Sequence, residues 1–201
     1  MRLITNYREV AAAVESATGL RIEVLDGKAE AYADYIANLS YATLGSVLLL
    51  DVGGATAELA DMENGNMDDM YSLYMGPLAL SRRYNGMYPD EDEADAIRKH
   101  IRKTLKEGKI YKDLDFHHLV LVGGTAEALY RVYADYYSLP ASSVRRMDRK
   151  KLGKLLKHLL HSEDRSMLFI RNAPENVHVL IPAAILVNTV AKHFGSSDLL
   201  I

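Results

Sequence analysis

The sequence predicts an α/β fold, and three observations lead to that prediction. Helix and strand patterns alternate over the first quarter of the chain, in the order helix, strand, helix, strand. Two short apolar runs, at 47–50 and 119–122, each lead to a pair of glycines. Several longer segments space their apolar residues as amphipathic helices do. Together these patterns favour a sheet with helices packed on it.

The composition is that of an ordinary soluble globular chain. Its 201 residues are 49% hydrophobic and 25% charged, and the formal net charge is -3. This charge gives no general attraction to nucleic acid or to an anionic membrane, so we expect neither DNA, RNA nor membrane as a partner. The chain has no cysteine, which excludes thiolate zinc sites and cysteine nucleophiles and fits a reducing cytoplasm.

The N-terminal segment predicts two helices with a strand between them. Residues 8–18 carry apolar side chains at helical spacing and are followed by Gly19. Residues 20–27 alternate apolar and charged side chains, which predicts a strand with one polar face. Residues 29–39 favour a second short helix.

The stretch Ser46–Leu59 carries the strongest functional signal. Its apolar run predicts a strand buried on both faces that ends at Asp51. Gly53 and Gly54 follow, and backbone N–H groups at such a turn can converge on an anion. Asp51 and Glu58 are carboxylates near that anion, a combination that favours Mg²⁺ between carboxylate and phosphate. The alternative interpretation is a tight β-hairpin that needs glycine for its turn.

A long charged segment follows the glycine turn. Two further antiparallel strands are predicted around a turn at Glu63–Asn66. A long helix is predicted from Asp90 to Gly108, because its acidic residues come first and its basic residues last, the order that complements the helix dipole.

A second glycine pair, Gly123 and Gly124, lies between a short buried strand at Leu119–Val122 and a helix at Ala126–Tyr136. The N-terminus of that helix, with Thr125, suits the phosphate or sugar of a nucleotide, and two such turns can face one cleft. The preceding pair of histidines is not expected to bind one metal ion, because adjacent strand residues point to opposite faces.

The last third of the chain is predicted to be mostly helical. One helix follows Asp148, and a second covers Arg165–Arg171. A buried core helix runs to Gly195, since the apolar stretch Val177–Val190 is too short to span a bilayer. Ser197–Ile201 favours a final strand.

Five short motifs also agree in order and separation with those of one known family. DVGGATAEL at 51–59 is similar to DIGGGSTEL, and LDGKAEA at 25–31 to SGxEEA. SLYMG at 72–76 is similar to SLPLG, VGGTAEAL at 122–129 to GGT-x-x-AL, and Arg2 with Asn6 to R-x-x-x-N. These motifs resemble the exopolyphosphatase and guanosine pentaphosphate phosphatase (Ppx/GppA) family over essentially the whole chain.

The resemblance implies a fold and an activity. The family has the actin, sugar-kinase and Hsp70-like ATPase fold, in which two similar α/β domains enclose a cleft. It implies a ribonuclease H-like domain at 44–201, a mixed sheet flanked by helices, preceded at 1–43 by the tail of a similar first domain. It also implies Mg²⁺-dependent removal of terminal phosphate from inorganic polyphosphate or guanosine pentaphosphate. An incomplete first domain exposes apolar faces, so we expect a homodimer.

The resemblance also assigns roles to residues. Glu30 matches the glutamate that orients and deprotonates the attacking water, although a surface helix residue is the alternative interpretation. Asp51 and Glu58 match acidic residues near metal and phosphate. The implied phosphate-binding residues are Gly53, Gly54, Ala55, Thr56, Gly123, Gly124, Thr125 and Arg2.

Several positions depart from the family pattern. Ala29, Ala55, Ala57 and Ala79 stand where the family has glutamate, glycine, threonine and arginine, and the family's first phosphate loop has no counterpart. These departures favour an alternative, a catalytically degenerate polyphosphate- or nucleotide-binding regulatory module of the same fold. A kinase of this fold is a third hypothesis, but no acceptor site is recognisable in the sequence.

Overall fold

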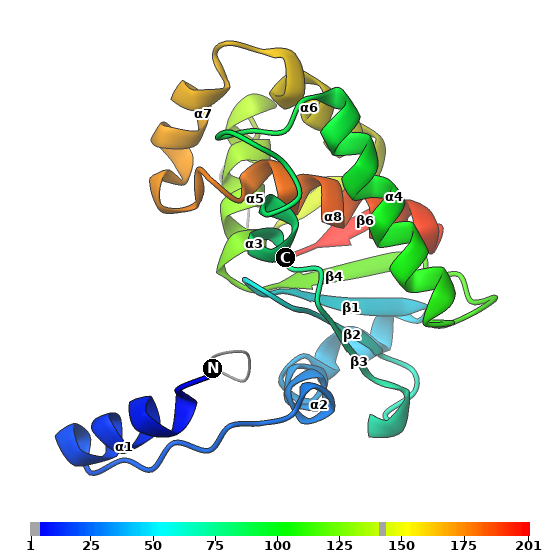
Figure 1. Cartoon of the computed structure of the whole chain (residues 1–201). Helices are drawn as coiled ribbons and strands as arrows, with labels where there is room; N and C mark the ends of the chain where they lie inside the picture. Colours follow the sequence, from blue (N-terminus) through cyan, green and yellow to red (C-terminus); the bar gives the residue numbers. More distant parts are fainter. Residues whose placement is uncertain (1–4, 141–143) are drawn as a thin grey trace.

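A mixed six-stranded sheet forms the centre of the protein, as seen in the computed structural model, which describes residues 5–140 and 144–201 (Figure 1). The strand order is β3-β2-β1-β4-β6-β5. β1 pairs in parallel with β4, and β4 with β6, whereas the other neighbours are antiparallel. The strands are β1 (Val47–Val52), β2 (Ala57–Asp61), β3 (Tyr71–Leu73), β4 (His118–Val122), β5 (Arg146–Asp148) and β6 (Asp198–Leu200). The three successive antiparallel strands β1, β2 and β3 confirm the predicted hairpins.

Helices cover the sheet unequally. The helices are α1 (Tyr7–Thr18), α2 (Gly27–Ala37), α3 (Pro77–Ser81), α4 (Glu91–Glu107), α5 (Gly124–Tyr136), α6 (Arg149–His161), α7 (Arg165–Asn172) and α8 (Leu180–His193). Short 3₁₀ turns occur at Leu39–Leu44, Met67–Asp69 and Pro174–Asn176. Figure 1 shows α4, α5 and α8 above the sheet and α2 below it. α1 lies apart from the sheet in that view, and none of its residues is buried.

The central strand β1 is buried on both faces, as predicted. Leu48 and Leu50 belong to the large apolar core on the side of α4, α5 and α8. Val47 and Leu49 belong to a smaller core that contains Ala31 of α2. Successive residues of a strand point to opposite faces, so β1 joins the two cores.

The longest helix ends where the sequence predicts. The Asp90 side chain accepts the Glu93 N–H while the Glu93 side chain accepts the Asp90 N–H, a reciprocal capping box that stabilises the start of α4. The predicted apolar stripe of α4 is fully buried, at Ala94, Ile97, Ile101 and Leu105.

α8 is the predicted buried helix, and Pro182 stands in its first turn, where a missing N–H breaks no helical bond. None of the helices within the described residues is both long and apolar enough to cross a bilayer.

One predicted strand is wrong. Residues 20–26 form no regular secondary structure, and the Leu20 side chain is 69% exposed. The alternating pattern suits a strand, but no described strand lies beside this segment to complete the backbone hydrogen bonds. Two short elements were not predicted: β5, which has three residues, and the helix α3, which has five.

Candidate functional site

Two carboxylates face each other across the first hairpin. Asp51 of β1 and Glu58 of β2 are register partners in the antiparallel pair. Both side chains alternate with residues of the large core, so they lie on the other face of the sheet, toward α2. Glu58 is fully buried. The predicted metal residues are therefore brought together between the sheet and α2.

A serine on the neighbouring strand holds Glu58 in place. The Ser72 hydroxyl of β3 donates to Glu58 Oε1 over 2.6 Å. Ser72 also supports α2, because a Cβ on Gly27 would come within 2.5 Å of Ser72 Cβ. The first turn of α2 therefore packs directly on the Ser72 side chain of β3, which leaves no room for a side chain at residue 27.

α2 contributes two more carboxylates to this region. Asp34 follows Glu30 by one helical turn, so both side chains lie on neighbouring parts of one helix face. Burial, then the charges of Glu58 and Glu30, raise the pKa of Asp34 to about 6. Burial, then the charges of Asp34, Glu58 and Glu30, raise the pKa of Asp51 to about 7. Four carboxylates from α2, β1 and β2 thus share one electrostatic environment.

The glycine turn after β1 is held in place by hydrogen bonds that its carbonyl groups accept from residues 76 and 78. The N–H of Gly76 donates to the Ala55 carbonyl over 3.0 Å, and the N–H of Leu78 donates to the Gly54 carbonyl over 2.8 Å. A Cβ on Gly76 would lie 2.4 Å from the Gly54 carbonyl oxygen, so only glycine permits this contact. Among the described residues, no backbone carbonyl accepts from the N–H groups of residues 53–56. These N–H groups are available to an anion.

The second glycine turn lies directly beside Asp51. Gly123 has a φ of 98°, and a Cβ there would lie 2.7 Å from Asp51 Oδ1. Gly123 is the N-cap of α5, and no side chain caps that helix. The first N–H groups of α5 therefore point out of the helix without a partner from a capping side chain. A helix N-terminus of this kind favours phosphate through both its N–H groups and its dipole.

The two turns occupy the carboxyl ends of adjacent parallel strands, β1 and β4, where the strand order changes direction. This is the position at which open α/β sheets bind ligands. Gly54 and Gly124 face open space, since a Cβ on either would meet no other residue within 4 Å. The arrangement places N–H donors for an anion next to a group of carboxylates.

The carboxylates suit a Mg²⁺ ion that is also bound by water and substrate phosphate, rather than a metal ion held only by protein side chains. The carboxylates supply oxygen ligands, and no described Lys, Arg or His forms an ion pair with Asp34 or Asp51. Within the described part of the chain, no three Asp, Glu or His side chains are close enough to hold a metal alone. Mg²⁺ commonly uses one or two carboxylates together with water and substrate phosphates, which matches this geometry.

Comparison with known proteins identifies the family. The model of the Ppx/GppA phosphatase family matches residues 1–201. The chain belongs to the Ppx/GppA phosphatase family.

Solved structures of Ppx/GppA proteins share the fold. A family member from Aquifex aeolicus is 20% identical, with a TM-score of 0.75 over 99% of this chain and 66% of that one. An exopolyphosphatase from Cytophaga hutchinsonii is 18% identical, with a TM-score of 0.77 over 99% of this chain and 67% of that one. An exopolyphosphatase-like protein is 16% identical, with a TM-score of 0.79 over 99% and 68%. The match confirms the predicted actin/Hsp70 ATPase-type fold, and the chain spans about two thirds of the length of these structures.

Most of the described residues that resemble Ppx/GppA site residues lie at the carboxyl ends of β1 and β4 and on the face of the sheet toward α2. Arg2 lies outside the described residues. Ala57 is fully buried in the large core. The family's hydroxyl at that position would therefore meet core atoms in this chain, and Ala57 concerns packing rather than the loss of a ligand contact.

Three residues that shape the candidate site were not predicted from the sequence: Asp34, Ser72 and Gly76. Asp34 could have been found from its spacing of four residues after Glu30. Ser72 and Gly76 belong to the SLYMG motif, which was recognised only as a resemblance. Their roles depend on two contacts that exist only in the folded chain. Ser72 contacts Glu58 on the neighbouring strand, and Gly76 contacts the glycine turn.

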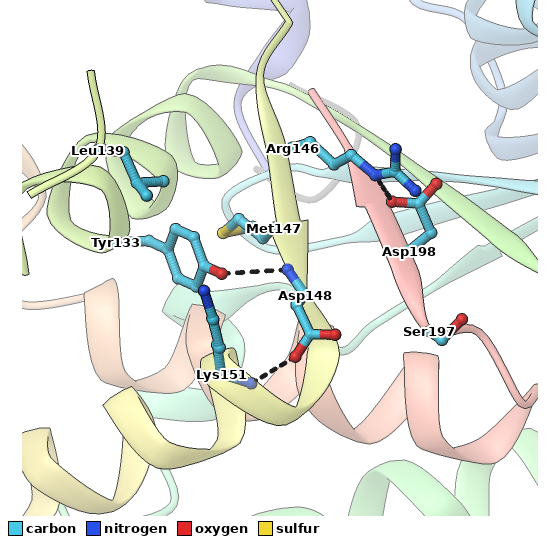
Figure 2. Close-up of a pocket in the computed structure, with 8 residues that line it drawn as sticks. All are labelled: Tyr133, Leu139, Arg146, Met147, Asp148, Lys151, Ser197 and Asp198. Atoms are coloured by element: carbon cyan, nitrogen blue, oxygen red, sulfur yellow. Dashed lines mark hydrogen bonds and ion pairs between the residues drawn. The ribbon is translucent and has the colours of Figure 1, made fainter. Parts of the chain in front are cut away.

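A separate pocket of about 380 Å³ lies at the other edge of the sheet, between β5, β6, α5 and α6 (Figure 2). Its charged groups already have partners within the chain. Arg146 pairs with Asp198, and the Asp148 carboxylate accepts the backbone N–H of Lys151 at the start of α6. The Lys151 ammonium lies over the Tyr137 ring, 5.4 Å from its centroid. The Tyr133 hydroxyl accepts the Asp148 N–H. An anion would have to displace these bonds, so this pocket is not the candidate phosphate site.

Proposed function

We propose that this chain supplies the phosphate- and metal-binding lobe of a phosphohydrolase that removes terminal phosphate from inorganic polyphosphate or guanosine pentaphosphate. The observation that carries the proposal is the position of Asp51. Its carboxylate lies against Gly123 of one glycine turn and on the strand that ends in the other. Membership of a phosphatase family supports hydrolysis as the reaction class.

The N–H groups of the two turns are proposed to hold the phosphate chain. Phosphoryl transfer depends mainly on positioning and on neutralising charge, because the transferred group itself carries the developing negative charge. The turn at 53–56 and the first turn of α5 provide N–H groups from two directions. Gly54 and Gly124, which face open space, allow phosphate oxygens to approach the backbone.

Glu30 is proposed to orient the attacking water and to accept its proton. It lies in the first turn of α2 and is partly exposed, so water can reach its carboxylate. The contact between Gly27 and Ser72 fixes the start of this helix against β3. A general base must lie within hydrogen-bond distance of the water that it activates, so this support is needed for the role.

Asp51 and Glu58 are proposed to hold Mg²⁺ together with the substrate phosphates. The ion supplies charge neutralisation that this acidic region lacks. Asp51 itself receives no ion pair from a described cationic side chain, and the neighbouring carboxylates repel any phosphate that approaches without a cation.

The test measures phosphate release by the purified chain from polyphosphate and, separately, from guanosine pentaphosphate, with Mg²⁺ and with chelator. We expect Mg²⁺-dependent release on one of the two substrates, and loss of at least about a hundredfold in rate for Glu30→Gln. Glu163→Gln, an exposed change between α6 and α7, serves as the control. Wild-type rates in Glu30→Gln would contradict the assigned base.

A second candidate is a binding module without catalysis. It is favoured by Ala79, which is 8% exposed in α3 where the family has arginine, so one cationic phosphate contact is missing. This candidate predicts Mg²⁺-dependent binding of polyphosphate by calorimetry with no phosphate release, and equal binding by Glu30→Gln.

A further inference from the structure

The helix α6 presents a row of lysines to solvent, although the chain as a whole has a net charge of -3. Its inner side is buried and consists of leucines, at Leu152, Leu155, Leu156, Leu159 and Leu160. Lys150, Lys154 and Lys157 are exposed. Steps of four and three residues keep side chains on one face of a helix, so these three lysines form a row opposite the leucines. This lysine row extends about 10 Å along the helix axis.

In the part of the chain that the structure describes, no carboxylate neutralises the lysine row. None of its three side chains forms an ion pair there. Residues 149–161 include no Asp or Glu. The carboxylate of Asp148 comes just before the helix and accepts the backbone N–H of Lys151. At the other end of the helix, Glu91 of α4 lies 3.5 Å from His161, where the basic surface ends.

The order of charges along α6 opposes the field of its own helix. The N-terminus of a helix carries partial positive charge, which repels Lys and Arg. The first turn of α6 nevertheless consists of Arg149, Lys150 and Lys151 and has no acidic residue. In α4, by contrast, acidic residues stand in the first turn and Lys106 in the last, the order that the dipole favours. Helix stability therefore accounts for the lysines of α4 but not for those at the start of α6.

A flexible chain of phosphates complements the lysine row better than other polyanions do. Single-stranded nucleic acids are bound by stacking their bases on aromatic rings. Residues 149–161 include no Phe, Tyr or Trp, and the neighbouring rings of Tyr136 and Tyr137 already contact His158 and Lys151. A helix that binds a membrane surface inserts its apolar face, whereas the leucines of α6 are buried in the core. A phosphate chain without bases requires only cations along a line.

We propose that the lysine row of α6 binds inorganic polyphosphate, as a docking surface separate from the glycine turns. The choice of polyphosphate rests on the proposed function, but binding at the row requires no hydrolysis. α6 follows β5 at the edge of the sheet, whereas the glycine turns follow the central strands β1 and β4. A long phosphate chain that contacts both surfaces dissociates more slowly than one that contacts either surface alone, because the second contact is intramolecular.

The test measures binding of long-chain polyphosphate, labelled at one end with a fluorophore, to the full chain by fluorescence anisotropy in chelator. Without Mg²⁺ the carboxylates around Asp51 oppose phosphate at the glycine turns, so the lysine row dominates binding. The triple variant Lys150→Gln, Lys154→Gln, Lys157→Gln removes three charges and keeps good helix formers. We expect its affinity at low salt to be about five- to fiftyfold lower, and its slope of log affinity against log salt to be less steep by about 2.

A matched control exists on α4. Lys99, Lys103 and Lys106 are exposed and have the same spacing of four and three residues. The triple variant Lys99→Gln, Lys103→Gln, Lys106→Gln therefore makes the same change in net charge, and we expect it to bind polyphosphate nearly as tightly as wild type. Arginine at the three α6 positions should restore binding that glutamine removes. Thermal unfolding without ligand should show the α6 glutamine variant to be as stable as wild type, because it loses no ion pair.

The two glutamine variants and two further probes decide the proposal. Unchanged affinity in the α6 variant, or an equal loss in the α4 variant, would overturn it. Tighter binding of polyuridylic acid or of phosphatidylserine vesicles than of polyphosphate, at equal phosphate concentration and salt, would assign the lysine row to nucleic acid or to a membrane and would also overturn it. Because binding is measured in chelator, a chain that binds polyphosphate through the row and releases no phosphate with Mg²⁺ would contradict only the proposed hydrolysis.

Discussion

Replacing Asp51 by asparagine should make the metal-free protein more stable at alkaline pH. The folded-state pKa of Asp51, about 7, lies above its ordinary value of 3.8, so the folded chain holds this proton more tightly than the unfolded chain does. The resulting penalty is absent below about pH 4, grows as pH rises toward 7, and is constant above it. At 1.36 kcal/mol per pKa unit the penalty is at most about 4 kcal/mol, and partial exposure reduces it to about 2 kcal/mol.

The assay is thermal unfolding of wild type and Asp51→Asn at pH 8 and at pH 4, in chelator. A gain of about 2 kcal/mol raises Tm by about 4–8 °C for a chain of this size, and the gain should vanish at pH 4. Asp164→Asn, at an exposed position before α7, should shift Tm equally little at both pH values. Mg²⁺ at pH 8 should stabilise wild type more than the variant. An Asp51→Asn protein that is less stable than wild type at pH 8 would refute the electrostatic reasoning.

Four further substitutions test the contacts that build the site and those that hold the loop at 108–116 on β2. Ser72→Ala leaves buried Glu58 without the 2.6 Å bond from this hydroxyl, so urea unfolding should show a loss of about 1–3 kcal/mol, and a loss below about 0.5 kcal/mol would contradict the role. Gly76→Ala places a Cβ 2.4–2.7 Å from backbone atoms of residues 54–56 and should cost about 1–3 kcal/mol or more. In Gly54→Ala the added Cβ has no other atom within 4 Å, so the variant should lose less than about 1 kcal/mol of stability. It should nevertheless weaken phosphate binding, measured by calorimetry. Equal stability losses in the two glycine variants would oppose this account. Tyr111→Phe removes the bonds to Asp61 and Asp69 and should cost about 1–3 kcal/mol by the same unfolding measurement, whereas an unchanged midpoint would show that the loop at 108–116 is held by other contacts.

The parts of the fold that could be predicted are those whose signal is local. The run from Val47 to Asp51 and the stripe of α4 each carry their periodicity within one segment, and both were found with nearly correct ends. The strand predicted at 20–27 satisfied the same local rule and is absent, because a strand also requires a neighbour. β5 was missed because three residues, two of them charged, carry no periodic signal.

The candidate site divides in the same way. Asp51, Gly53 and Glu58 lie within one short motif, so sequence order alone placed them together. Asp34 shares their environment only because α2 packs across β1 and β2, and Ser72 contacts Glu58 only because β3 pairs with β2. Contacts of this kind depend on tertiary structure, and a pattern within one segment does not contain them.

The register of the first hairpin has a kinetic consequence. Asp51 and Glu58 become neighbours as soon as β1 pairs with β2 through a loop of four residues, a closure that costs little chain entropy. Gly123 reaches Asp51 only after β4, some 70 residues later in sequence, has joined the other side of β1. Local contacts form before distant ones in most small domains. The acidic half of the site is therefore expected to assemble early in folding, and the second anion-binding turn late, so the site is completed only when the parallel part of the sheet has formed.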